Sequence, residues 1–67
     1  MKQVICIVYD KVSGIHTAPM TFTNENCAVR WFKTTIKENI EDYSLIKIAD
    51  YEPVSGQIGT HKPIILN

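Results

Sequence analysis

Little in this sequence points to catalysis or to covalent cross-links. Its 67 residues include only two cysteines, three glycines and three prolines. Cys6 and Cys27 allow at most one bridge, which excludes a disulfide framework, and we expect both to be reduced, small apolar side chains. The glycines are scattered and form no phosphate-binding loop. The net charge at pH 7 is zero, so no global field attracts nucleic acid or an anionic membrane.

Metal ligands and catalytic pairs are equally scarce. His16 and His61 stand far apart, and neither belongs to a motif with zinc-ligand spacing. The adjacent acids Glu41 and Asp42 are typical of a solvated turn, because two carboxylates that work as acid and base need distinct environments. We therefore predict that the protein is not an enzyme and that it holds no metal and no cofactor.

The length of the chain restricts it to one domain, residues 1–67, with a thin core. So short a chain buries a low fraction of its surface, and we expect a second copy to supply the missing stabilisation as a homodimer. No segment approaches the roughly 18 apolar residues of a membrane span, and the N-terminal apolar run is too short for a secretory signal. We expect a cytosolic protein that contacts no membrane.

Strand signals occur in both halves of the sequence. Residues 3–9 are apolar on both faces and rich in β-branched side chains, which is typical of a central strand. The strand after the first turn is expected at an edge, or interrupted at Pro19, because proline lacks the N–H group of a ladder. Residues 42–52 predict a third strand, and residues 57–59 begin a short fourth. Residues 60–67 are an apolar tail that docks on the sheet or on a partner.

The third strand has a simple predicted alternation. Ile46 and Ile48 are assigned to one face, and Leu45, Lys47 and Ala49 are assigned to the other.

A helix is predicted between the two pairs of strands. Thr23 or Asn24 can cap its N-terminus, and Asn39 is a stop signal. Apolar side chains recur at helical spacing on one side, which suits packing on a sheet: Ala28, Phe32 and Ile36. Cations share the opposite side: Arg30, Lys33 and Lys37.

Two turns repeat one pattern. Tyr9–Gly14 reads YDKVSG and Tyr51–Gly56 reads YEPVSG, each directly after an apolar run. Each glycine can adopt the positive φ of a tight turn, and the acid and serine can hydrogen-bond the loop backbone. We interpret the pair as the product of the same local physics rather than as a shared ligand loop. The predicted fold is α+β: a small ββαββ domain whose antiparallel sheet has one helix packed on one face.

Nucleic-acid binding is the one chemistry with local support. Cations combine with aromatic planes on which unstacked bases can lie. The candidate residues are Arg30, Lys33, Lys37, Lys47, Trp31 and Tyr43. A basic helix face is also typical of the solvated side of any amphipathic helix, and Trp31 also suits the core. Both interpretations stay open at this stage.

The order of motifs extends over nearly the whole chain. Asn24-Glu25 precedes Ala28, Arg30 and Phe32, and it is followed by Glu41-Asp42-Tyr43 with Leu45 and an acidic turn that ends at Gly56. This order resembles the small nonstructural protein of gokushoviruses, the Microviridae subfamily of small single-stranded DNA phages. The resemblance implies an accessory protein, labelled DNA-binding, that is linked to the switch from duplex replication to single-stranded genome synthesis in the host cytoplasm.

Two hypotheses follow. The leading one is a dimeric replication accessory protein that binds single-stranded DNA or the phage or host replication machinery. The alternative is a protein–protein interaction module that regulates a replication or host enzyme without binding nucleic acid. The zero net charge favours the alternative, and the basic helix stripe favours the leading hypothesis.

Overall fold

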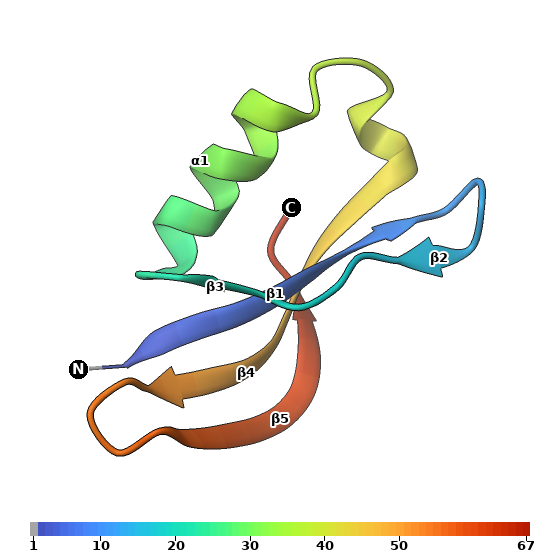
Figure 1. The fold of residues 1–67 in the computed structure, drawn as a ribbon. Helices are drawn as coiled ribbons and strands as arrows, with labels where there is room; N and C mark the ends of the chain where they lie inside the picture. Colours follow the sequence, from blue (N-terminus) through green and yellow to red (C-terminus); the bar gives the residue numbers. More distant parts are fainter. Residues whose placement is uncertain (1) are drawn as a thin grey trace.

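An antiparallel sheet with one helix across one of its faces forms the fold (Figure 1). The computed structural model describes residues 2–67. In chain order the elements are β1 (Gln3–Asp10), β2 (Ile15–His16), β3 (Met20–Phe22), α1 (Glu25–Thr35), a 3₁₀ turn (Ile40–Asp42), β4 (Tyr43–Glu52) and β5 (Gln57–Ile65). The strand order is β2-β1-β4-β5, and β3 also pairs with β1. No helix of the described residues is long and apolar enough to cross a membrane.

The α+β class is confirmed, but the strands are more divided than predicted. The second strand consists of two short pieces, β2 and β3, which both pair with β1, and Pro19 lies in the interruption between them. The order is therefore βββαββ rather than ββαββ. The last strand is longer than expected, because β5 has 9 residues and takes in most of the apolar tail, including Pro63.

A β-bulge in the central pair of strands corrects the predicted alternation of β4. The pairing of β1 with β4 shifts by one residue, so that Cys6 lies opposite Lys47 while Ile5 lies opposite Ala49. Ile48 is the extra residue. Because directly opposed residues of antiparallel strands share a face, Lys47 lies on the helix face and Ala49 lies on the other face. The prediction that these two residues share a face was wrong.

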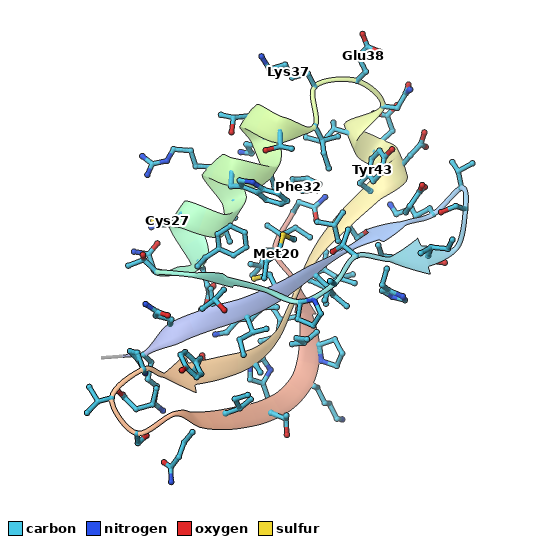
Figure 2. The ribbon with its side chains drawn as sticks, in the orientation of Figure 1. Met20, Cys27, Phe32, Lys37, Glu38 and Tyr43 are labelled. Carbon is cyan, nitrogen blue, oxygen red and sulfur yellow. The ribbon has the colours of Figure 1, made fainter. Side chains whose placement is uncertain are left out.

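The core fills the space between α1 and the sheet. Its fully or nearly buried members are Val4, Cys6, Val8, Ala28, Phe32 and Leu45. Phe32, which points from α1 toward the sheet (Figure 2), is completely buried, as is Leu45. Around them pack partly buried side chains from the neighbouring elements: Met20, Phe22, Val29, Trp31, Ile36, Ile40, Tyr43 and Leu66. The apolar stripe predicted for the helix is thus its core side.

Both ends of α1 have a local cause. The Asn24 side chain accepts a hydrogen bond from the Cys27 N–H at 2.8 Å, so Asn24 rather than Thr23 is the N-cap. The helix ends at Thr35, earlier than Asn39. Asn39 instead adopts a left-handed conformation, with φ of 55°, at the start of the 3₁₀ turn. Lys37 consequently lies beyond the helix rather than on it.

The chain end closes over the core. The N–H of Leu66 donates to the carbonyl of Leu45 at 2.8 Å. The Asn67 carboxamide accepts from the Leu45 N–H at 2.7 Å and donates to the Tyr43 carbonyl at 3.1 Å. These bonds continue the attachment of β5 to β4 up to the last residue.

The two repeated turns have the geometry that their residues predict. Gly14 and Gly56 both adopt φ of 75°. The carbonyls of Asp10 and Glu52 accept from the N–H groups of these glycines at 2.8 and 2.7 Å. The two turns lie at opposite ends of the sheet (Figure 1), since the strands that lead into them, β1 and β4, are antiparallel neighbours.

The acidic residue of each turn, Asp10 or Glu52, also accepts a hydrogen bond from the loop backbone through its side chain. The Asp10 carboxylate accepts from the Val12 N–H at 2.9 Å, and that of Glu52 accepts from the Val54 N–H at 3.0 Å. The hydrogen bond from Val12 holds the pKa of Asp10 below its ordinary value, and the bond from Val54 does the same for the pKa of Glu52. The ionised side chains therefore stabilise the turns.

Replacing Asp10 by Ala tests whether its ionised carboxylate stabilises the turn, because that contribution to stability depends on pH. Because the pKa of Asp10 is lowered by folding, its carboxylate stabilises the fold above the unfolded-state pKa of about 4, and the contribution is lost as the pH falls through the lowered value. Urea unfolding of wild type and Asp10→Ala should differ most near neutral pH and converge in acid. The exposed Glu38 provides the control, Glu38→Ala. A difference for Asp10→Ala that does not shrink in acid would contradict the assignment.

Candidate functional site

Three of the six nominated residues lie on the outer side of α1 and just after it. Arg30 and Lys33 are exposed on the helix. Lys37, which Figure 2 labels, is exposed beyond the helix end. Their side chains form no ion pair within residues 2–67, so their charges are not neutralised by direct contact with the acids of that part. We call these three residues the cation row. Lys33 also lies in the last turn of the helix, where a positive charge is favoured by the helix dipole.

Lys47 does not belong to this row. It lies between α1 and the sheet, with a side chain only 12% exposed, and its Nζ is 3.0 Å from Glu25 Oε2 and 3.2 Å from Asp50 Oδ1. Hydrogen bonds to Glu25 and then to Asp50 raise the pKa of Lys47. Lys47 therefore fastens the first residue of α1 to β4, and its charge is taken up by two carboxylates rather than offered to a phosphate.

The two nominated aromatic residues are engaged with the core. Trp31 is partly buried, and its ring centroid lies 5.3 Å from that of Phe22 at a tilt of 49°. Tyr43, at the start of β4, is also partly buried against the core (Figure 2). Neither ring is a freely exposed plane for a base, so the structure separates the aromatic residues from the exposed cations.

A small polar cluster extends from Lys47. His61 Nε2 lies 3.9 Å from Asp50 Oδ2 and is buried without a hydrogen-bond partner, while Nδ1 lies 2.8 Å from the Lys62 carbonyl. A proton on Nδ1 would donate to that carbonyl and leave Nε2 as a bare acceptor. Burial raises the pKa of the nearby Cys6 thiol, which opposes a reactive thiolate. Within residues 2–67 no group of three or more His, Cys, Asp or Glu side chains can hold a metal ion.

The face of the sheet opposite α1 is mainly apolar. The register also places five polar residues on it: Gln3, His16, Thr21, Ser44 and Thr60. Strict alternation along β1 places Ile5, Ile7 and Tyr9 opposite the core residues. The register then brings Ile46, Tyr51, Ile58 and Ile65 onto the same face, because Ile46 pairs with Ile7 and with Ile65, and Tyr51 pairs with Ile58. None of these seven residues packs against the core cluster. We call them the open face.

Sequence reasoning recognised only part of the open face. The two-sided apolar pattern of β1 indicated an uncovered side, but the bulge at Ile48 hid the contribution of Tyr51. Ala49 lies at the centre of this face, and its side chain is almost fully buried among larger neighbours although it is outside the core cluster. A bulge has no sequence signal of its own in this strand, since no glycine or proline marks it.

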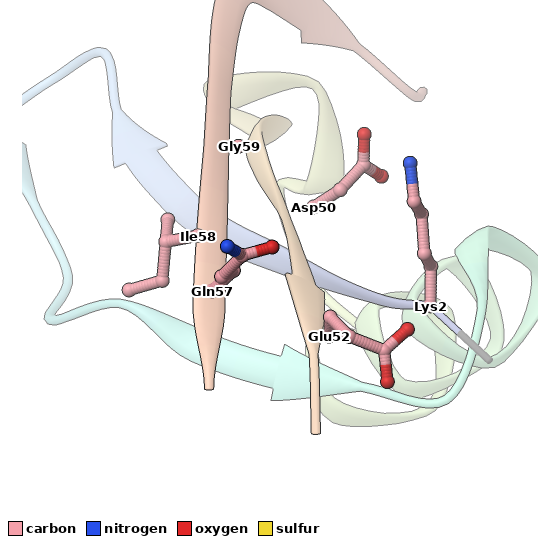
Figure 3. A pocket seen from close by; sticks show the side chains of 6 residues that line it. All are labelled: Lys2, Asp50, Glu52, Gln57, Ile58 and Gly59. Carbon is pink, nitrogen blue, oxygen red and sulfur yellow. The ribbon is translucent and has the colours of Figure 1, made fainter. Parts of the chain in front are cut away.

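Two shallow pockets lie near the two repeated turns. One, of about 340 Å³, is lined by Lys2, Asp50, Glu52, Gln57, Ile58 and Gly59 (Figure 3). The other, of about 260 Å³, is lined by Val8, Asp10, Ser13, Ile15, His16, Thr17 and Tyr43. Carboxylates line both pockets, and a carboxylate repels a phosphate. Neither pocket therefore suits a nucleic-acid backbone better than the cation row does.

Comparison with known proteins places these features in a family. A family model described as "Phage ORF5 protein" matches residues 3–67, which include every strand and the helix. No curated protein and no solved structure matches the chain.

Replacing Lys47 by Met separates its structural role from a role in binding. The apolar stem is kept, but Glu25 and Asp50 lose their shared cation, so we expect a loss of about 1–2 kcal/mol in the free energy of unfolding, measured with urea. Lys33→Met, on the exposed side of α1, should change it by less than about 0.5 kcal/mol. Equal losses in the two variants would show that Lys47 has no special contact.

Proposed function

Because the chain belongs to the family of phage ORF5 proteins, we propose that it is a nonstructural accessory protein of phage genome replication. It acts in the host cytoplasm of a gokushovirus infection, and it works by binding rather than by catalysis. Its ligand is single-stranded DNA, held through the cation row. The observation that carries the proposal is the exposure of Arg30, Lys33 and Lys37 without direct acidic partners in the described residues.

The spacing of the cation row along the chain supports a contact with the phosphate backbone of DNA. Arg30 and Lys33 are three residues apart on one helix, and such side chains are neighbours on a helix surface, about 5–6 Å apart at Cβ. Lys37 continues the row past the helix end. A short row of cations can follow successive phosphates of one strand, and an Arg adds a fork that fits phosphate oxygens.

The burial of the nearby aromatic side chains limits the kind of DNA binding that we propose. Since Trp31 and Tyr43 pack against the core, base stacking contributes little on this side of the molecule. Affinity then depends mainly on phosphate contacts, which carry no sequence information and release counterions. The proposed mode is therefore independent of sequence and strongly weakened by salt.

Titration of a labelled single-stranded oligonucleotide at several salt concentrations tests the cation row. For single strands the logarithm of the affinity falls with the logarithm of the salt concentration by about 0.7 per phosphate contact. The variant Arg30→Ala/Lys33→Ala/Lys37→Ala should therefore bind weakly and show a slope flatter by about 2.

A matched control removes the same charge elsewhere. The variant Lys2→Ala/Lys11→Ala/Lys62→Ala also loses three positive charges, from exposed residues outside the row. It should keep most of the slope of the wild type. If both triple variants flatten the slope equally, only net charge matters and the assigned site is wrong. If the wild type does not bind even at low salt, the DNA-binding proposal is overturned.

A second candidate function is a protein-interaction module that regulates a phage or host replication enzyme without touching DNA. The observation that favours it is the presence of exposed apolar side chains at both hairpin tips, where Val12 is 78% and Val54 is 89% exposed. Failure of the oligonucleotide titration with a folded protein would favour this candidate over the first.

A further inference from the structure

The open face of the sheet has the properties of a self-association surface. Its residues come from three adjacent strands, β1, β4 and β5, so they form one continuous surface rather than scattered exposed side chains. We propose that two copies of this chain pack open face to open face as a two-fold symmetric dimer. Three observations favour a second copy as the partner: the lack of charge on the open face, the symmetry of the sheet and the size of the molecule.

Charge is the first argument. None of the residues that the register places on this side of the sheet is a Lys, Arg, Asp or Glu. In a two-fold interface the same patch appears on both sides, so a charge that has no opposite charge within the patch would meet a like charge or lie buried without a partner. A nucleic acid or a charged partner would instead require cations or anions on this surface. An uncharged patch avoids both penalties only with an apolar partner, and an identical copy meets that condition.

Symmetry within the sheet is the second argument. β1 and β4 are antiparallel neighbours that end in the same kind of turn at opposite ends of the sheet. Tyr9 therefore lies near one end of the open face and Tyr51 near the other, with isoleucines between them. When such a surface is turned over onto a copy of itself about an axis across the strands, the end of the face with Tyr9 lies over the end with Tyr51. The contacts of the two copies are then equivalent, as a two-fold interface requires.

Size is the third argument. A standard stable interface buries about 800 Å² on each partner, which is about one sixth of the 4625 Å² of this chain. The two longest extents of the molecule, 38 and 21 Å, enclose a projected area of about the same size. A dimer of this chain thus needs a complete broad face. The face beneath α1 is already used for the core, and the outer side of α1 bears the cation row, so the open face is the broad surface without charge.

This packing has a consequence for the arrangement of the helices. Because α1 and the open face lie on opposite sides of each sheet, the dimer is a four-layer stack with both helices outside. The two cation rows then point away from each other. That last step rests on the proposed function, since it means that one dimer can hold two segments of single-stranded DNA, whereas the dimer itself does not depend on DNA.

The mass in solution tests the dimer without any DNA. Size-exclusion chromatography with light scattering, run from low to high micromolar protein, should give twice the 7.6 kDa of the chain at the upper end. Ile58→Lys and Ile65→Lys each place a charge on the open face, at residues that are 59% and 63% exposed in the single chain. Each should weaken dimerisation by about tenfold or more while leaving the circular dichroism spectrum of the monomer unchanged.

The control carries the same new charge outside the open face. Val54→Lys, at a hairpin tip that is 89% exposed, should dimerise like the wild type. A wild-type chain that stays monomeric at every concentration overturns the proposal. So does an undiminished dimer in both isoleucine variants, an equal loss in Val54→Lys, or a mass that keeps rising beyond two copies.

Failure of this proposal is distinguishable from failure of the DNA proposal. The isoleucine variants retain the complete cation row, so a monomeric Ile65→Lys chain should still show the salt slope per chain of the wild type. A dimer that binds no oligonucleotide at low salt leaves the open face assigned and removes only the DNA function.

Discussion

One short helix has to cover a sheet that is larger than it. The 11 residues of α1 extend for only about 16 Å at 1.5 Å per residue, while β4 alone has 10 residues at more than twice that rise. The helix therefore covers only part of the face on which it packs, and one layer of side chains centred on Phe32 and Leu45 forms the core. Other contacts supplement the small cover that α1 provides: the tail closes over β4, and ion pairs hold the start of α1. The other side of the sheet is left as a mainly apolar surface.

Although the net charge is zero, the acidic and basic residues differ in how many of them have partners in the fold. Of the seven acids, Asp10 and Glu52 hold the two turns, and Glu25 and Asp50 surround Lys47. The cations of α1 receive no such partner within the described residues. A neutral chain can thus present a locally positive surface, because four of its seven acids are engaged in contacts that stabilise the fold. Total charge describes the field at a distance, whereas binding at contact range depends on which charges are left unpaired.

Sequence reasoning succeeded where a structural feature is encoded by neighbouring residues. The positive φ of Gly14 and Gly56 and the apolar side of α1 depend on a few adjacent positions, and the structure confirms both. For the cap, the sequence left Thr23 and Asn24 as alternatives, and the structure selects Asn24. The placement of Lys47 failed for a different reason. Its ion pair with Glu25 joins residues 22 positions apart in the chain, and the bulge at Ile48 decides on which face its neighbours lie. Such features arise only when the strands are brought into register, so a linear pattern does not contain them.

The proline within β5 has a consequence for how copies of this chain can associate. β5 is the outer strand of the sheet, and Pro63 removes one backbone N–H from it. An unprotected outer strand invites the same strand of another molecule to extend the sheet, and repetition of that step produces fibrils. A gap in the row of donors interrupts such lateral growth. Assembly by stacking of faces stops at a finite number of molecules, whereas growth along strand edges does not, and Pro63 favours the outcome in which the assembly stays discrete.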